Sequence, residues 1–226
     1  MKPTHIFFDL DHTLWDFDKN SALTFKKIFE LNRIPVNVEK FLNYYQNINL
    51  KYWRLYRVDK VTKEQLRYGR LKDTFEILKI DFSDDVISKL SEDYITYLST
   101  FNHLFHGTHE LLTYLKTKYT LHIITNGFIE VQNKKLENSG IRKYFDQIIT
   151  SEQVGVKKPN SKVFKYALQK AGAINTESFM IGDSWEADIM GAKNYGLNVI
   201  YCNFGNETVG ESIPSVKNLL EIKNFL

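Results

Sequence analysis

Two aspartates separated by one residue follow an apolar stretch near the start of the chain, in the segment IFFDLDHT (residues 6–13). If residues 6–10 form a strand, side chains alternate between its faces, so Asp9 and Asp11 project to the same side. Thr13 joins them if the chain stays extended. Carboxylates about 4 Å apart, at an effective dielectric constant of about 20, repel each other by about 4 kcal/mol. A hard cation such as Mg²⁺ would offset that repulsion, so the spacing favours a metal-assisted reaction over the alternative, a solvated turn.

The segment before these carboxylates is apolar on both faces, which is typical of a central parallel strand covered by helices. After Gly107 the chain alternates between strand-like and helix-like segments, as parallel α/β domains do. We expect strands at residues 121–126, 147–150, 179–181 and 198–202, helices at 110–118, 130–139, 162–171 and 186–195, and a terminal helix introduced by Pro214 and Ser215. In open sheets of this kind ligands bind beyond the carboxyl ends of the strands.

Residues 21–101 have a different character, because their apolar positions recur at helical spacing in four successive segments. Thr62 and Gln65 have the spacing of a capping box at the start of the third segment, and Ser83 is a candidate N-cap of the fourth. We therefore predict a core domain of residues 1–15 and 105–226, interrupted by an all-helical domain of residues 16–104.

Further polar residues stand where the later strands of the core are expected to end. They are Thr125 and Asn126, then Lys158, then Asp183 and Asp188. The Thr125 hydroxyl and the amides beside it can donate to a phosphate oxygen. Taken singly, each residue has a structural alternative: a strand-end threonine, a solvated lysine, or aspartates that favour the start of a helix. Their order and placement together predict one site at one edge of the sheet.

Taken in order, these residues resemble the four motifs of the haloacid dehalogenase superfamily of phosphohydrolases. The motifs are DxDxT from Asp9, TN from Thr125, KP from Lys158 and GDSxxxD over residues 182–188. The resemblance implies a Rossmann-like parallel sheet core of three layers, α/β/α, with an inserted helical cap of the superfamily's first cap class. More narrowly, residues 8–17 (FDLDHTLWDF) and 124–132 (ITNGFIEVQ) resemble the pyrimidine 5′-nucleotidase branch.

The resemblance also implies a role for each motif residue. Asp9 would be the nucleophile that forms an aspartyl-phosphate, and Asp11 would act first as general acid and then as general base. Mg²⁺ would be held by a carboxylate oxygen of Asp9, the backbone carbonyl of Asp11 and the carboxylate of Asp183, with Asp188 and Thr13 behind these ligands. Thr125, Asn126 and Lys158 would bind the phosphoryl oxygens, with Lys157 as a rival for the lysine.

The substrate implied by the narrower resemblance is a nucleoside 5′-monophosphate, with pyrimidine bases preferred. Trp15, Phe17 and Phe128 are candidates for an aromatic wall against the base, because stacking on an aromatic side chain stabilises a bound base by roughly 1–3 kcal/mol. A phosphatase of broad specificity, acting on sugar phosphates or phosphoglycolate, remains an alternative. A mutase with the same phosphoryl chemistry is another.

Asp11 discriminates among reaction types. Dehalogenases and P-type ATPases of the superfamily lack this second aspartate, so its presence argues for phosphoryl transfer, which a mutase would share. A phospho-aspartate receiver switch also collects aspartate, threonine, lysine and Mg²⁺ at strand ends. Such a switch needs no general acid and has no helical insert of eighty residues, which makes an enzyme the better interpretation.

Composition narrows the classes of partner. The 226 residues carry a formal net charge of +3 and scattered basic residues, which gives nucleic-acid binding no support. The single Cys202 excludes an internal disulfide framework and suits a reducing compartment. No apolar stretch approaches the length of a membrane span and no signal-peptide pattern is present, so we expect a cytoplasmic protein. No pattern specifies an oligomeric state.

Overall fold

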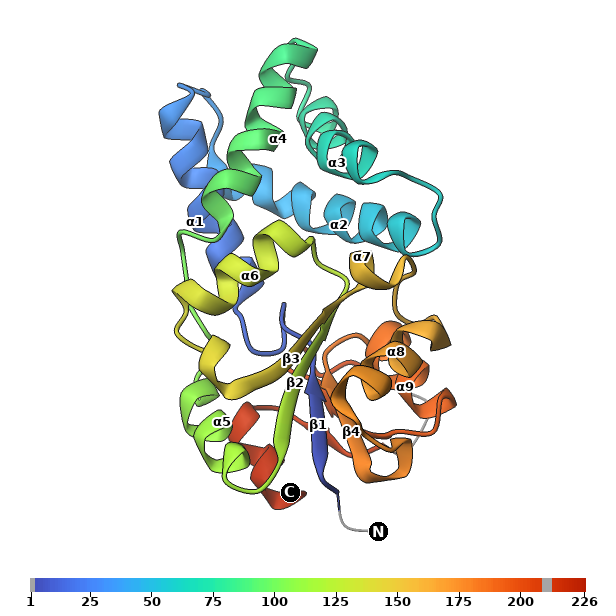
Figure 1. Ribbon diagram of the computed structural model, residues 1–226. Coiled ribbons are helices and arrows are strands. Elements are labelled where there is room, and N and C mark those ends of the chain that lie inside the picture. Colours follow the sequence, from blue (N-terminus) through green and yellow to red (C-terminus); the bar gives the residue numbers. More distant parts are fainter. Residues whose placement is uncertain (1–2, 209–212) are drawn as a thin grey trace. The chain divides into compact units, whose positions relative to one another are not determined.

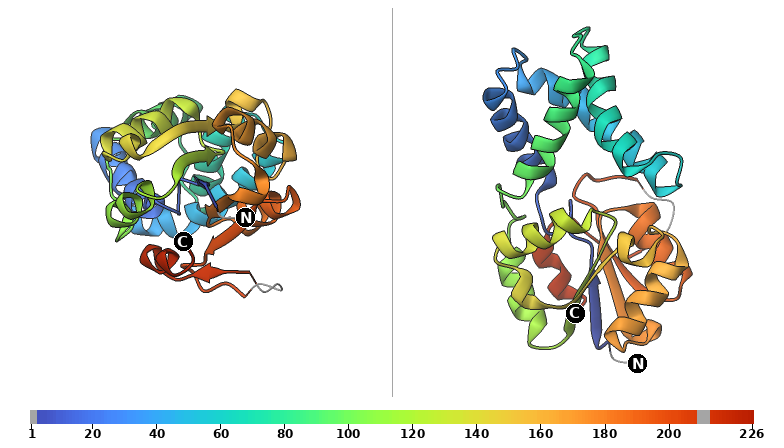
Figure 2. Two further views of the ribbon diagram at one scale, coloured as in Figure 1. Left: turned by 60° about the horizontal axis from the view of Figure 1, so that its bottom comes forward. Right: turned by 45° about the horizontal axis from the view of Figure 1, so that its top comes forward.

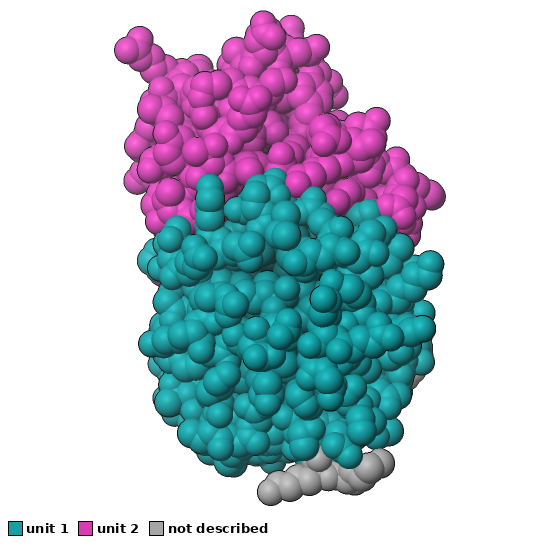
Figure 3. Space-filling view, in the orientation of Figure 1, with its two compact units in different colours: residues 1–17, 102–226 teal, residues 18–101 magenta. Residues whose placement is uncertain are grey.

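The computed structural model of the protein describes residues 3–208 and 213–226. The described chain divides into two compact units (Figure 3). One comprises Met1–Phe17 and Asn102–Leu226 and contains the sheet, and the other comprises Asp18–Phe101 and is helical.

Within the described residues, one parallel sheet of six strands forms the centre of the first unit, in the order β3-β2-β1-β4-β5-β6. Its strands are β1 (His5–Phe8), β2 (Thr120–Thr125), β3 (Phe145–Thr150), β4 (Ser178–Gly182), β5 (Asn198–Cys202) and β6 (Ser215–Val216). The chain order reverses at β1, which pairs with β2 on one side and β4 on the other. Such a switch point is where open α/β sheets bind their ligands.

Helices cover both faces of this sheet, with α5 and α6 on one side and α8 and α9 on the other (Figures 1 and 2). The α-helices of this unit are α5 (Thr108–Lys116), α6 (Ile129–Asn138), α7 (Ser151–Val154), α8 (Ser161–Ala171) and α9 (Gly191–Asn194). The unit also contains the 3₁₀ helices η1 (Arg142–Tyr144), η2 (Asn175–Glu177) and η4 (Leu219–Asn224) and the π-helix η3 (Trp185–Met190). Phe7 of β1 packs with Phe164 of α8 in one core cluster, whereas its neighbours Ile6 and Phe8 project to the opposite face. The predicted Rossmann-like α/β/α core is confirmed.

The C-terminal segment differs from the prediction. No helix begins at Pro214 and Ser215, because Ser215 and Val216 form β6 at the edge of the sheet. The Tyr201 amide donates to the Pro214 carbonyl at 2.8 Å and the Asn203 amide donates to Val216 at 2.9 Å, which holds this segment extended. The helix η4 starts only after Asn218, whose side chain accepts from two amides of its first turn.

The second unit, all of whose residues 18–101 are described, contains four helices, as the apolar spacing predicts. They are α1 (Phe17–Leu31), α2 (Val38–Arg57), α3 (Lys63–Ile77) and α4 (Asp84–Leu98). Thr62 and Gln65 form the predicted capping box. Ser83 is the N-cap residue of α4, but its side chain makes no capping hydrogen bond. Aromatic rings from all four helices make the core of this unit, among them Phe25, Phe41, Phe75 and Tyr94.

A histidine pair lies inside the sheet unit, between β1 and β2. His122 is fully buried and stacks against the rings of His5 and Phe7. Its Nδ1 accepts a hydrogen bond from the Gln147 amide at 3.3 Å, so the ring proton resides on Nε2 and is donated to Nδ1 of His5 at 3.0 Å. Both nitrogens of a neutral His122 are therefore satisfied.

Candidate active site at the carboxyl ends of the strands

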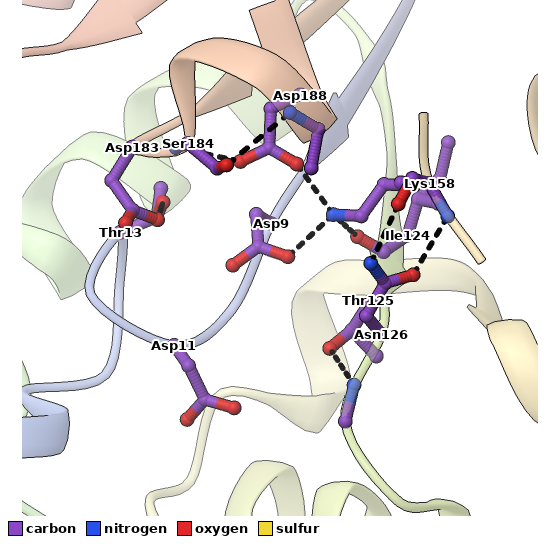
Figure 4. A network of polar contacts seen from close by, with 12 residues as sticks. Asp9, Asp11, Thr13, Ile124, Thr125, Asn126, Lys158, Asp183, Ser184 and Asp188 are labelled. Atoms are coloured by element: carbon purple, nitrogen blue, oxygen red, sulfur yellow. Dashed lines mark hydrogen bonds and ion pairs between the residues drawn. The ribbon is translucent and has the colours of Figure 1, made fainter. Parts of the chain in front are cut away.

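The segment after β1 turns sharply instead of continuing the strand. β1 ends at Phe8, and the amides of Leu14 and Trp15 both donate to the Leu10 carbonyl at 2.9 Å. His12 within this turn has a φ of 61°, in the left-handed region. The strand alternation assumed for Asp9 and Asp11 therefore does not extend to Asp11. The two carboxylates stand apart from each other (Figure 4). Asp9 pairs with Lys158, and Asp11 pairs with Lys135.

Asp9 belongs to a cluster of three carboxylates. Asp9, Asp183 and Asp188 each offer an oxygen, and these oxygens lie within 4.8 Å of one another. Asp9 directly follows β1, and the other two flank the turn between β4 and η3. Thr13 donates to Asp183 at 2.9 Å, and the Ser184 amide donates to Asp188 at 3.0 Å. The structure thus brings together the acids that the sequence placed at separate strand ends.

The electrostatics of this cluster suit a cation. Burial raises the pKa of Asp183 to about 7, and the neighbouring Asp188 carboxylate adds to the shift. Burial also raises the pKa of Asp9 well above its usual range, against the opposing charge of Lys158. Hard carboxylate oxygens at this separation are the ligands that Mg²⁺ and similar ions prefer. A divalent ion would stabilise the charged carboxylates that burial disfavours, so the donor set fits the predicted metal.

Lys158 is the lysine that reaches Asp9, in preference to Lys157. Its ammonium lies 2.6 Å from Asp9 Oδ1 and 2.7 Å from Asp188 Oδ1, and it donates to the Ile124 carbonyl at 2.6 Å. Burial opposes the charge on Lys158, but the Asp188 and Asp9 carboxylates outweigh it and hold its pKa above the ordinary value. Lys158 therefore carries a fixed positive charge beside Asp9.

Asn126 and Thr125 hold this region from the end of β2. The Asn126 side chain donates to the Lys158 carbonyl at 3.0 Å and accepts from the Lys158 amide at 2.9 Å, so it fixes the lysine loop in place. The Thr125 hydroxyl accepts from the Gly127 amide at 3.0 Å and from Gln132 Nε2 at 2.7 Å. With both lone pairs engaged, the hydroxyl proton of Thr125 is available to a further acceptor.

Asp11 is held by two residues that the sequence reasoning did not assign to the site. Lys135 Nζ of α6 lies 2.5 Å from Asp11 Oδ1, and Gln132 Nε2 donates to Asp11 Oδ2 at 2.9 Å. A signal existed in the sequence, because these residues are three positions apart and lie on one face of a helix. Gly127 is a second signal: a Cβ built there would lie 2.4 Å from the Gln132 side chain, so the glycine makes room for Gln132.

The three predicted aromatic residues are buried in this structure. Trp15 is 0%, Phe128 4% and Phe17 8% exposed. The Trp15 and Phe17 rings lie 6.2 Å apart, and the Lys135 ammonium stands 4.2 Å from the Trp15 ring centroid. Phe128 is the N-cap residue of α6. Their proposed contact with a base remains a prediction.

Comparison with known proteins identifies the family. Residues 6–202 match the family model described as haloacid dehalogenase-like hydrolase. The chain belongs to the haloacid dehalogenase-like hydrolases. The family resemblance read from the four motifs is thereby confirmed. It is a family of enzymes, which excludes the receiver-type switch.

Individual relatives in this hydrolase family match along most of the chain. The pyrimidine 5′-nucleotidase YjjG of Escherichia coli is 35% identical over 230 residues, covering 100% of this chain and 99% of the relative. The pyrimidine 5′-nucleotidase PynA of Streptococcus pneumoniae is 32% identical over 203 residues, covering 88% and 83%. The crystal structure of the putative HAD-hydrolase YfnB from Bacillus subtilis, bound to magnesium, superposes with a TM-score of 0.90 at 26% identity and covers 100% of this chain and 99% of that one.

The described part of this hydrolase has no helix that is both long and apolar enough to cross a membrane.

Proposed function

We propose that this hydrolase is a Mg²⁺-dependent phosphomonoesterase that acts through an aspartyl-phosphate on nucleoside 5′-monophosphates, with pyrimidine bases preferred. The reaction type is supported above all by Asp9, a buried carboxylate at the end of β1 with Lys158 at 2.6 Å and two more carboxylates beside it. The substrate class is supported by the 35% identity to a pyrimidine 5′-nucleotidase over the length of both chains.

The acidic cluster would hold the metal in this proposal. Asp9 and Asp183 would supply carboxylate oxygens and Asp11 its backbone carbonyl, as the motif resemblance implies. Asp188 is the third member of this acidic cluster. Its carboxylate contacts the Lys158 ammonium and accepts a hydrogen bond from the Ser184 amide. When bound, the ion would neutralise charge on the transferring phosphoryl group and on the cluster.

The chain's own residues then divide the chemistry. A carboxylate oxygen of Asp9 attacks phosphorus, and the bond from phosphorus to the ester oxygen breaks. Asp11 gives a proton to the departing alkoxide, and in the second step takes a proton from the water that attacks the aspartyl-phosphate. Lys158 and the available Thr125 hydroxyl proton stabilise the phosphoryl oxygens, on which charge is spread during transfer.

The proposal excludes halide displacement because Asp11 is present and its proton is of no use to a departing halide. A mutase remains chemically equivalent in its first step. The two differ in the second step, since a mutase returns the phosphoryl group to a sugar and a phosphatase gives it to water.

The deciding experiment is a substrate panel. We expect kcat/KM for deoxyuridine and thymidine 5′-monophosphates to exceed that for adenosine 5′-monophosphate, and to exceed those for ribose 5-phosphate and phosphoglycolate by about tenfold or more, as a stacked base would give. Inorganic phosphate should appear in step with nucleoside. Equal efficiency on either non-nucleotide would overturn the nucleotidase assignment in favour of a broad phosphatase.

A further inference from the structure

One helix, α6, supplies both side chains that hold the Asp11 carboxylate. We propose that Gln132 and Lys135 are positioning residues that fix Asp11 for proton transfer to the leaving group, and that Gln132 ties this acid to the phosphoryl-binding Thr125. This inference rests on the proposed function. All of the residues involved belong to the sheet unit.

Gln132 makes a two-way bridge with one amide nitrogen. Its Nε2 donates one proton to Asp11 Oδ2 at 2.9 Å and the other to Thr125 Oγ1 at 2.7 Å. The amide cannot be turned round, because its Oε1 would then face a carboxylate oxygen. In the present orientation Oε1 is buried without a hydrogen-bond partner among the described residues. Leaving a buried amide oxygen without a hydrogen-bond partner costs free energy. What this orientation provides in return is a hydrogen bond to each of two site residues, Asp11 and Thr125.

Lys135 supplies the second hold on Asp11. Its side chain is 2% exposed, and its ammonium contacts Asp11 Oδ1 at 2.5 Å while standing 4.2 Å from the centre of the Trp15 ring. Burying an ammonium group costs several kcal/mol, which a close carboxylate and an aromatic face offset. The Asp11 side chain keeps 22% of its surface exposed. Both carboxylate oxygens of Asp11 are thus bound by α6 side chains, and the Asp11 side chain remains partly exposed to solvent.

The contacts of Gln132 and Lys135 with Asp11, called the grip below, hold the acid Asp11 away from the nucleophile Asp9. No ion pair or hydrogen bond of the described residues joins Asp11 to the Asp9 cluster, and Figure 4 shows its carboxylate set apart from Asp9, Lys158 and Asp188. A proton donor for the leaving oxygen must stand clear of the attacking carboxylate, because the two oxygens lie in line on opposite sides of phosphorus. A small displacement of such a donor can cost a large part of its contribution.

A positioning role for the acid makes a specific kinetic prediction. A nucleoside leaves as a basic alkoxide and needs the proton of Asp11, whereas 4-nitrophenolate leaves readily without it. The parameter kcat/KM reports the steps up to formation of the aspartyl-phosphate, so it isolates the acid role from the later attack of water. Damage to the grip should therefore lower kcat/KM for a nucleotide far more than for 4-nitrophenyl phosphate.

The test compares Gln132→Met and Lys135→Met with Lys134→Met, whose wild-type side chain is exposed on the same helix. Gln132→Met keeps the length of the side chain and Lys135→Met shortens it by one atom. Both remove the donors to Asp11. We expect each to lower kcat/KM for deoxyuridine 5′-monophosphate by about 10- to 100-fold. For 4-nitrophenyl phosphate the loss should be about threefold or less in Lys135→Met. Gln132→Met also removes a donor to Thr125, so its loss on 4-nitrophenyl phosphate should be larger, but at least threefold smaller than its loss on the nucleotide. Lys134→Met should match the wild type on both substrates. Lys135→Arg, which keeps a cation, should recover part of the loss on the nucleotide.

The outcomes distinguish failure of the positioning role of Gln132 and Lys135 from failure of the proposed function. If a folded variant, checked by its thermal unfolding, loses equal efficiency on both substrates, or none on the nucleotide, the grip is overturned and the phosphatase stands. If the wild type hydrolyses neither substrate with Mg²⁺ present, the proposed function fails and the grip with it. If Lys135→Met does not fold, the uncharged Gln132→Met decides by the same ratio.

Discussion

Asp9 and Asp11 are the same chemical group two positions apart, and each has a buried lysine within 2.6 Å, yet their surroundings differ. Around Asp9 there are three carboxylates, two of which, Asp9 and Asp188, pair with Lys158 from the loop before α8. Around Asp11, one carboxylate meets Lys135 and the Gln132 amide, both from α6. The first group carries a formal excess of negative charge, and the second pair is balanced.

The difference shows how one short motif can yield two functions. The excess negative charge around Asp9 is suited to a divalent cation and to attack on phosphorus once that cation is bound. The balanced surroundings of Asp11 leave no reason for a metal at its carboxylate, which is held instead by Gln132 and Lys135. In the proposed mechanism, the element that contributes the lysine and the number of acids around that lysine distinguish the nucleophile from the proton donor.

The largest effect is expected from Asp9→Asn, because an amide oxygen cannot form the aspartyl-phosphate. Turnover of every phosphate ester, whatever its leaving group, should fall by about 10⁴-fold or more. Rapid-quench trapping with radiolabelled substrate would show no phosphoenzyme. Phosphoryl label found on another side chain of this variant would contradict the assignment of Asp9 as the nucleophile.

Asp11→Asn should be selective where Asp9→Asn is not. Loss of the acid should lower kcat/KM for a nucleoside 5′-monophosphate by about 10²- to 10⁴-fold. For 4-nitrophenyl phosphate the loss in kcat/KM should be at least tenfold smaller, and phosphoenzyme should still form and then persist. Identical losses on the two substrates would contradict the separate role given to Asp11.

Metal dependence should belong to the Asp9 side alone. A chelator should abolish activity and Mg²⁺ should restore it, whereas the larger Ca²⁺ should restore it poorly. Asp183→Asn should raise the Mg²⁺ concentration for half-maximal activity by about 10- to 100-fold, as loss of a metal-site group does. Lys135→Met is the matched control and should leave that concentration unchanged. A shift in both variants would show that the two sides are not independent.

Gly127→Ala should give the smallest catalytic effect and reach only the Asp11 side. The added Cβ would lie 2.4 Å from the Gln132 amide, which must swing away and loosen Asp11. We expect kcat/KM for the nucleotide to fall by about tenfold, with 4-nitrophenyl phosphate little affected. Gly205→Ala, where a Cβ meets nothing within 4 Å, is the control. An unchanged nucleotide rate would show that Gln132 can move without consequence.

The sequence predicted those parts of the site that depend on residue type and strand order. Asp9 and Asp183 directly follow β1 and β4, and Lys158 and Asp188 come from the segments that follow β3 and β4. Parallel strands bring their carboxyl ends to one edge. The parallel α/β domain followed from the alternation of strand-like and helix-like segments, and its three layers from the family resemblance. The Thr62 capping box was predictable because its two hydrogen bonds are local.

What the sequence could not supply depends on tertiary packing. The alternation that paired Asp9 with Asp11 stops because β1 ends at Phe8 and the chain turns back to Leu10. Gln132 and Lys135 have no strand-end position to mark them, and their approach to Asp11 depends on how α6 packs beside the sheet. Likewise β6 forms where a helix was expected, because the edge of β5 offers unpaired backbone groups to Ser215 and Val216.

The buried His122, which stacks against the half-buried His5, makes the fold itself sensitive to acid. Burial, the facing His5 and, to a smaller extent, Lys116 lower the pKa of His122 to about 4, while Asp146 opposes the shift. An unfolded chain would bind the proton near pH 6.5, so the free energy of unfolding should fall by up to about 3 kcal/mol as the pH drops from 6.5 to 4. Urea unfolding at pH 7.5 and pH 5 should show this loss in the wild type and in a His109→Asn control, whose histidine is exposed. His122→Asn should show less of this loss, and an undiminished loss would assign the acid sensitivity to other groups.

Protonation of His122 would also place an N–H donor at Nδ1, facing the Gln147 amide that now donates to it. The sheet that carries the catalytic acids would thus be least stable under the conditions in which those acids are most readily protonated.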